Sequence, residues 1–100
     1  MSFEVINPKE LKGYLERRDV IIVDLRDKEE YLKYHLPGAV NIPYEQLEER
    51  NKWLKRYPVI VFYCDRGNVS LMAARDLKDW ENKVITVSGG VHQFRELFNR

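Results

Sequence analysis

The chain has 100 residues, of which 44% are hydrophobic and 33% charged, a balance typical of one globular domain spanning residues 1–100. Its 17 basic and 16 acidic residues leave a net charge of +1, which gives no overall field to attract nucleic acid or an anionic membrane as a partner. A single cysteine excludes an internal disulfide and a four-cysteine zinc site, and the N-terminal residues lack a secretory leader pattern. We therefore expect a cytoplasmic protein.

In chain order, short apolar runs alternate with segments of helical spacing. The expected strands are 3–6, 20–24, 39–42, 59–63 and 83–87. The expected helices follow Asn7 and Asp27, extend from Tyr44 to Tyr57, and begin again at Val69 or Ser70 and at Val91. This alternation predicts an α/β fold: a doubly wound, mainly parallel five-stranded sheet with helices on both faces.

Local signals predict where these helices start and which faces they bury. Asn7 with Glu10, and Asp27 with Glu30, have the spacing of capping boxes. Apolar positions at helical spacing are expected to face inward: Leu11, Tyr14, Leu15, Tyr31, Leu32, Leu47, Leu54, Tyr57, Val69, Ala73, Leu77, Trp80, Val91, Phe94, Leu97 and Phe98.

The most apolar strand, 59–63, is followed directly by the only cysteine, Cys64. A strand end that leads into a helix lies at the carboxyl edge of a parallel sheet, where open α/β folds bind ligands. The first amides of that helix would stabilise a thiolate, Gly67 suits a left-handed turn, and Ser70 suits an N-cap. We interpret Cys64 as a nucleophile rather than a buried structural cysteine, because polar residues and glycine follow it.

Other polar residues near the predicted site allow two interpretations each. Asp24 and Arg26 end a neighbouring strand, so Arg26 could contact a substrate, or the pair could fix the strand end through charge-assisted hydrogen bonds. His35 lies in a turn and His92 starts the last helix, and we expect structural or solvated roles for both.

Five segments, in order, give the chain a resemblance to a known family. They are VDLR at 23–26, HLPGAVNIP at 35–43, a Cys-x-x-Gly-x-x-Ser loop at 64–70, the helix positions Ala73, Ala74 and Leu77, and the turn Gly89–Gly90. On these residues the chain resembles the single-domain rhodaneses, which are sulfurtransferases.

The resemblance implies a covalent mechanism. Cys64 would take a sulfane sulfur from a donor such as thiosulfate, carry it as a persulfide, and pass it to a thiophilic acceptor such as cyanide or a cellular thiol. The loop residues Asp65, Arg66, Gly67, Asn68, Val69 and Ser70 would bind the substrate, largely through backbone amides. The resemblance implies a monomer that needs no metal and no organic cofactor. Its partners would be a small sulfur donor and a small acceptor, and a protein could serve in either role.

The loop departs from the family pattern in its charges. Val69 stands where many members have arginine, and Asp65 where some thiosulfate-using members have a basic residue. Arg66 is then the only cation within the loop, and we expect it to contact an anionic donor. Asp65 would repel that donor.

Two alternatives remain beside the sulfurtransferase. A cysteine phosphatase needs arginine six positions after its nucleophile, and here that position is Ser70, which disfavours this activity. The other alternative is a non-catalytic or partner-dependent persulfide carrier or protein-interaction module of the same fold. A carrier would turn over small molecules poorly and would receive sulfur from a partner protein.

Overall fold

The structure is a computed structural model that describes residues 3–98. With η for a 3-10 helix, the chain forms in order β1 Glu4–Ile6, η1 Glu10–Tyr14, β2 Val20–Asp24, α1 Lys28–Lys33, β3 Val40–Asn41, η2 Tyr44–Gln46, η3 Glu48–Arg50, α2 Asn51–Leu54, β4 Val59–Tyr63, α3 Asn68–Asp76, β5 Lys83–Val87 and α4 Gly90–Phe98.

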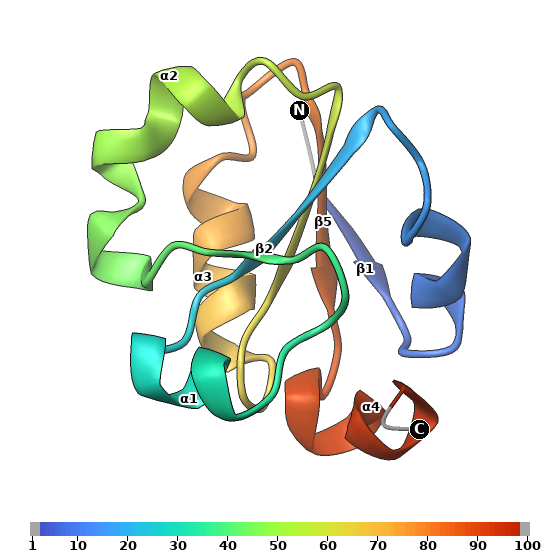
Figure 1. Ribbon diagram of the computed structural model, residues 1–100. Coiled ribbons are helices and arrows are strands. Elements are labelled where there is room, and N and C mark those ends of the chain that lie inside the picture. Colours follow the sequence, from blue (N-terminus) through green and yellow to red (C-terminus); the bar gives the residue numbers. More distant parts are fainter. Residues whose placement is uncertain (1–2, 99–100) are drawn as a thin grey trace.

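The five strands form one sheet in the order β1-β5-β4-β2-β3, and every neighbouring pair is parallel. The predicted α/β architecture with a parallel five-stranded sheet is therefore confirmed. Strand β4 lies at the centre, and all five of its residues are buried. All strands run in one direction, so their carboxyl ends meet at one edge of the sheet, the lower edge in Figure 1.

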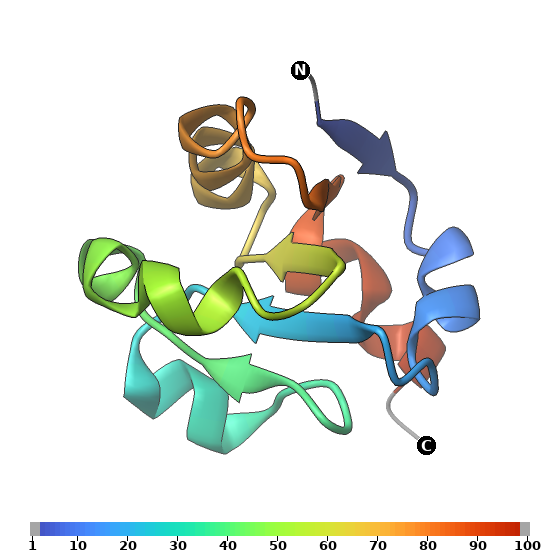
Figure 2. The same ribbon diagram turned by 90° about the horizontal axis from the view of Figure 1, so that it is seen from above.

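Helices cover both faces of the sheet (Figures 1 and 2). Alternate strand residues point to opposite faces. Ile60 and Phe62 pack with Ala73 of α3 on one face, whereas Val61 packs with Phe94 of α4 on the other. The chain thus leaves β4 toward one face and β5 toward the other. The loops after these two neighbouring strands meet at the carboxyl edge, which is where such sheets bind ligands.

The segment predicted as one helix from Tyr44 to Tyr57 is instead broken into η2, η3 and α2. Its turns close through bonds between residues three apart, as in the donation from the Leu47 N–H to the Tyr44 carbonyl. Arg50, with φ −104° and ψ 8°, interrupts the helical geometry before α2. Burial of Leu47 and Leu54 holds this segment against the sheet, so the apolar spacing survives although the regular helix does not.

Two residues predicted to face inward lie at the surface: Leu32 is 65% exposed and Leu97 is 40% exposed. Helix α1 has only six residues, and the half-buried Tyr31 docks it by donating a hydrogen bond to the Ala39 carbonyl (2.7 Å). In α4, Phe94 is fully buried and fills the core position, which leaves Leu97 turned outward.

Of the two predicted capping residues, Asn7 and Asp27, only Asn7 makes the expected hydrogen bonds. Asn7 caps the first helical turn by accepting hydrogen bonds from the Lys9 and Glu10 amides, and the Glu10 carboxylate accepts from the Asn7 amide, so this capping box is confirmed. Asp27 precedes α1 but makes no capping hydrogen bond with its side chain.

The longest helices, α3 and α4, have nine residues each, and no helix within residues 3–98 combines the length and apolarity needed to cross a bilayer.

Substitutions on α4 test which of its apolar residues belong to the core. Phe94→Ala should lower the free energy of unfolding by about 3–5 kcal/mol, because it leaves a cavity where a fully buried ring packs between Tyr63 and Phe98. The matched variant Leu97→Ala should cost less than about 1 kcal/mol, since that side chain is already partly in water. Urea denaturation measures both, and equal losses would contradict this placement of α4.

Candidate active site

Cys64 lies immediately after β4, at the carboxyl edge of the central strand. Its side chain is almost completely buried, yet it lines an open cavity of about 370 Å³. Cys64 therefore lies at the floor of the cavity. Cys64 is a free thiol, as the single cysteine of the sequence requires.

Two backbone amides point at this sulfur. The N–H groups of Gly67 and Ser70 donate to Cys64 Sγ at 3.1 and 3.3 Å. Hydrogen bonds to an anionic acceptor are stronger than those to a neutral one, so both donors favour negative charge on the sulfur. The sequence predicted this arrangement of loop amides around Cys64, and the structure supplies two of them.

The loop has this shape because glycines allow its backbone to turn and to be approached closely. Gly67 adopts φ +101°, in the left-handed region that its sequence context predicted. At Gly90 (φ +57°), a Cβ atom would lie 2.3 Å from the Cys64 carbonyl oxygen, so only glycine fits there. The N–H groups of Val91 and His92 then donate to the carbonyls of Cys64 and Asp65, both at 2.9 Å. The start of α4 thus fixes the backbone of the reactive loop.

Ser70 has a different role from the predicted N-cap. Helix α3 begins at Asn68, and Gly67 occupies the cap position, so Ser70 lies inside the first turn. Its hydroxyl donates to the Gly67 carbonyl (3.2 Å) and accepts from the buried Thr86 hydroxyl (2.7 Å), and it lies 3.6 Å from Cys64 Sγ. Ser70 is therefore a buried link between the sulfur, the loop backbone and β5.

Asp24 and Arg26 form a buried ion pair beside the cavity. The Asp24 carboxylate accepts from the Arg26 backbone N–H, from Nε and from Nη2 (2.9, 3.1 and 2.8 Å). Arg26 Nη2 also donates to the Tyr34 carbonyl. Burial lowers the pKa of Arg26, but its hydrogen bonds and attraction to Asp24 outweigh this, and the net pKa is raised. Arg26 stays charged, and that charge is largely neutralised by Asp24.

The remaining loop residues divide between two sides of the loop. Asp65 and Val69 line the cavity over Cys64. Arg66, which was predicted to contact an anionic donor, is 64% exposed, lies 3.8 Å from an Asp65 carboxylate oxygen, and lines a separate hollow with Gly67 and Asn68. The structure therefore brings Asp65 and Arg26 to the cavity but places the Arg66 side chain beside it.

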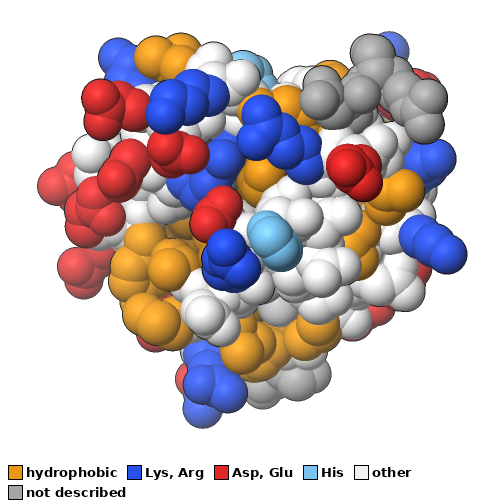
Figure 3. All heavy atoms as spheres, turned by 90° about the horizontal axis from the view of Figure 1, so that it is seen from below, with side chains coloured by type: hydrophobic (Ala, Val, Ile, Leu, Met, Phe, Trp, Pro, Cys, Tyr) orange, Lys and Arg blue, Asp and Glu red, His pale blue; other side chains and the backbone are white. Residues whose placement is uncertain are grey.

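Carboxylates dominate the rim of the cavity. Its lining includes the exposed side chains of Asp27, Glu30, Glu45 and Asp65. Arg26 is the only basic residue of the lining within residues 3–98, and it is already paired. Figure 3 views the molecule from the carboxyl edge of the sheet and shows acidic side chains gathered on one side of it. A molecule that approaches Cys64 from that side thus meets negatively charged side chains.

Neither histidine reaches the sulfur. His35 stacks on Tyr31 with ring centroids 3.8 Å apart, and its Nδ1 lies 2.8 Å from the Tyr31 carbonyl oxygen, so its position is structural. His92 is exposed and contacts the loop through its backbone. Over residues 3–98, no group of three or more His, Cys, Asp or Glu side chains is placed to hold a metal ion.

Sequence reasoning missed several residues of the site. It did not place Leu25, Asp27 or Glu30 at the cavity, and it also missed Thr86, Tyr44 and Glu45. Thr86 supports Ser70, while Tyr44 and Glu45 form part of the cavity lining. A signal for Thr86 was available, because it is the one polar residue among the inner positions of an otherwise apolar strand. Tyr44 and Glu45 carry no such signal, since only the path of the chain after β3 brings them to the cavity.

Comparison with known proteins agrees with this geometry. The family described as "Rhodanese-like domain" matches residues 7–97. A tRNA sulfurtransferase of Desulfurococcus amylolyticus is 36% identical over 77 residues, which are 77% of this chain but 15% of that protein. The thiosulfate sulfurtransferase GlpE of Coxiella burnetii is 25% identical over 96 residues, covering 95% of this chain and 90% of that one.

Among solved structures, a rhodanese-related protein of Thermoplasma volcanium superposes with a TM-score of 0.83 at 25% sequence identity, over 95% of this chain and 93% of the other. The match to the family extends over nearly the whole chain, and the solved structure shares its sheet and helices. The chain therefore belongs to the family of rhodanese-like domains.

Proposed function

We propose that the chain is a rhodanese-type sulfurtransferase in which Cys64 carries the transferred sulfur as a persulfide. The observation that supports this most directly is the sulfur of Cys64 at the floor of an open cavity, receiving hydrogen bonds from the Gly67 and Ser70 amides. The activities named for two similar proteins, both sulfurtransferases, agree with it. The proposed chemistry needs no metal and no organic cofactor.

The proposed reaction has two displacements. With thiosulfate, the Cys64 thiolate attacks the outer sulfur, the S–S bond of thiosulfate breaks, and sulfite leaves with the electron pair. With cyanide, the nucleophile attacks the outer sulfur of the Cys64 persulfide, that S–S bond breaks, and thiocyanate leaves while the pair returns to the Cys64 thiolate. The loop amides stabilise the anionic sulfur at both stages, as donors do in an oxyanion hole.

A second candidate function is a persulfide carrier that exchanges sulfur with partner proteins. The acidic rim of the cavity favours it, because Asp27, Glu30, Glu45 and Asp65 repel a small dianion such as thiosulfate. The two functions share the Cys64 persulfide and differ in turnover. Rapid cycling with thiosulfate and cyanide identifies a catalyst, whereas loading without such cycling identifies a carrier.

Replacing the nucleophile tests the step that both functions share. Incubation of the reduced protein with excess thiosulfate should add the mass of one sulfur atom, mapped to Cys64 and removed by cyanide. Cys64→Ser should gain no sulfur, because the hydroxyl cannot form a persulfide, and its circular dichroism should match the wild type. Intact-protein mass spectrometry measures the gain. Sulfur bound to the Cys64→Ser protein would contradict the assignment.

Arg66→Ala tests whether the loop cation assists an anionic donor. Removing an exposed charge near the path of thiosulfate should raise its Michaelis constant up to about fivefold, corresponding to at most about 1 kcal/mol. Arg75→Ala removes the same charge from an exposed position on α3 that lines neither the cavity over Cys64 nor the hollow beside Arg66, and it should leave the constant unchanged. Equal constants for both variants in steady-state assays would show that Arg66 does not contact the donor.

A further inference from the structure

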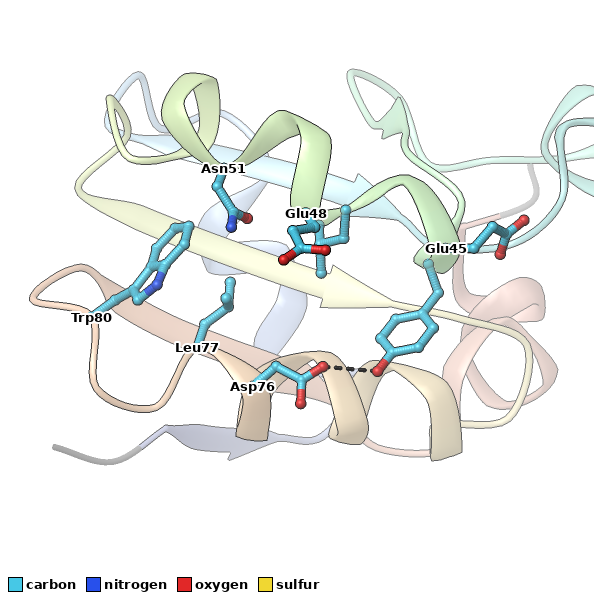
Figure 4. A pocket seen from close by; sticks show the side chains of 8 residues that line it. Glu45, Glu48, Asn51, Asp76, Leu77 and Trp80 are labelled. Atoms are coloured by element: carbon cyan, nitrogen blue, oxygen red, sulfur yellow. Dashed lines mark hydrogen bonds between the residues drawn. The ribbon is translucent and has the colours of Figure 1, made fainter.

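A second hollow adjoins the cavity over Cys64. It has a volume of about 450 Å³ and lies between α3 on one side and the η2–η3–α2 segment on the other (Figure 4). Tyr44 and Glu45 line both hollows, so the two are neighbours across this pair of residues. We call the second hollow the α3 groove. It extends the site from Cys64 along α3 to Trp80.

The floor of the α3 groove is apolar. Leu47 and Leu77 are buried at its base, and the partly buried Trp80 closes its far end. Tyr44 lines both hollows and donates a hydrogen bond to the Asp76 carboxylate (2.7 Å), which is the dashed line at Asp76 in Figure 4. This floor can accept the methylene part of a long side chain. If one residue of a bound polypeptide placed its side chain there, an adjacent residue would lie close to Cys64.

The walls of the α3 groove are acidic. Glu45, Glu48 and Asp76 line it, and no lysine or arginine does so within residues 3–98. At the far end, Lys55 Nζ lies 4.9 Å from the centre of the Trp80 ring. On the Cys64 side, Lys33 pairs with Glu30 at 3.5 Å, and both side chains are exposed. Asp27, Glu45 and Asp65 continue the acidic rim around the cavity.

One further group in the groove lacks a hydrogen-bond partner. The side-chain oxygen of Asn51, which lines the groove, is buried and accepts no hydrogen bond from residues 3–98. In Figure 4 the Asn51 side chain points from its helix toward the groove. A buried acceptor without a donor is costly, and an N–H donor entering the groove would remove that cost. Charge and hydrogen bonding thus both favour a cationic donor.

We propose that the sulfur-exchanging partner of this chain is a polypeptide whose reactive sulfur is flanked by lysine or arginine residues. Its basic side chains lie in the α3 groove, with their stems on Leu47 and Leu77 and their charged ends at Glu48 and Asp76, while its sulfur lies over Cys64. Nucleic acid is disfavoured as an occupant, because its phosphates would meet the same carboxylates. This proposal rests on the proposed function, since it assumes a reactive Cys64.

The exchange balances without any further reagent. The Cys64 thiolate attacks the outer sulfur of a partner persulfide, the partner's S–S bond breaks, and the electron pair leaves on the partner's inner sulfur as a thiolate. The proton of the persulfide stays on the outer sulfur, which is now bonded to Cys64. The partner is reduced to a thiol and Cys64 is oxidised to a persulfide, and the reverse step returns the sulfur.

Peptide disulfides test the docking independently of sulfur transfer. Three synthetic peptides of equal length carry one cysteine activated as a 2-pyridyl disulfide, flanked by lysine, by glutamine or by glutamate. The Cys64 thiolate attacks the peptide sulfur, and pyridine-2-thione leaves and is followed by its absorbance. At low salt the lysine peptide should react at least about tenfold faster than the glutamine peptide, and the glutamate peptide should react slowest. Near 1 M salt the three rates should converge, because the screening length falls to about 3 Å.

Paired variants locate the effect. In Glu48→Gln/Asp76→Asn, the ratio of the lysine-peptide rate to the glutamine-peptide rate should fall severalfold toward one. The matched control Glu16→Gln/Glu81→Gln removes two exposed carboxylates that line neither hollow, and it should keep the wild-type ratio. Taking the ratio within each protein cancels any change in the reactivity of Cys64 itself.

The outcomes separate the two proposals. Equal rates for the three peptides, or a faster glutamate peptide, would overturn the cationic partner while leaving Cys64 a competent nucleophile. An equal loss of the ratio in both paired variants would overturn the α3 groove as the binding surface. If no peptide reacts, and neither does a small neutral pyridyl disulfide, the proposed function fails and the partner proposal fails with it.

Discussion

The donation of two backbone hydrogen bonds to the sulfur of Cys64 is the interaction around which the rest of the structure is arranged. It requires the chain to reverse within the few residues between β4 and α3, which Gly67 permits through its positive φ. It also requires a second segment to hold that reversal in place. The turn at Gly90 does so, because the absence of a side chain lets its backbone lie against the carbonyl groups of Cys64 and Asp65. Parallel strands make this meeting possible, since they deliver both segments to one edge of the sheet.

The charges near the sulfur serve two separate purposes. Asp24 and Arg26 are buried and neutralise each other, and their hydrogen bonds fix the end of β2 to the segment around Tyr34. The carboxylates of the rim are exposed. Glu30 pairs with Lys33 and Asp65 lies 3.8 Å from Arg66, but both pairs are in contact with solvent, so the rim contributes to the potential that an approaching molecule meets. The hydrogen bonds of the Cys64 sulfur within residues 3–98 are to two backbone amides and the Ser70 hydroxyl, and none is to a cation.

The sequence predicted the architecture well because buried parallel strands have a strong signature, as Val59–Tyr63 illustrates. It also predicted the left-handed Gly67, since the polar loop after Cys64 left few other ways to turn. Side-chain placement on short helices was less predictable: Leu32 has the right spacing, but α1 is too short to press it against the sheet. The α3 groove lay beyond sequence reasoning altogether, because its walls come from segments separated by some 30 residues of chain, as the hydrogen bond from Tyr44 to Asp76 shows.

The contact between the loop and α4 also constrains the order in which the site can form. Cys64 and Asp65 receive hydrogen bonds from Val91 and His92, so the loop lacks its native anchor until the chain has been synthesised beyond residue 92. During translation, the cysteine emerges well before the segment that fixes its surroundings. Until that segment has folded, the thiol lies in a loop whose backbone is not yet held by α4. The geometry around the sulfur is therefore a property of the folded chain rather than of the loop alone.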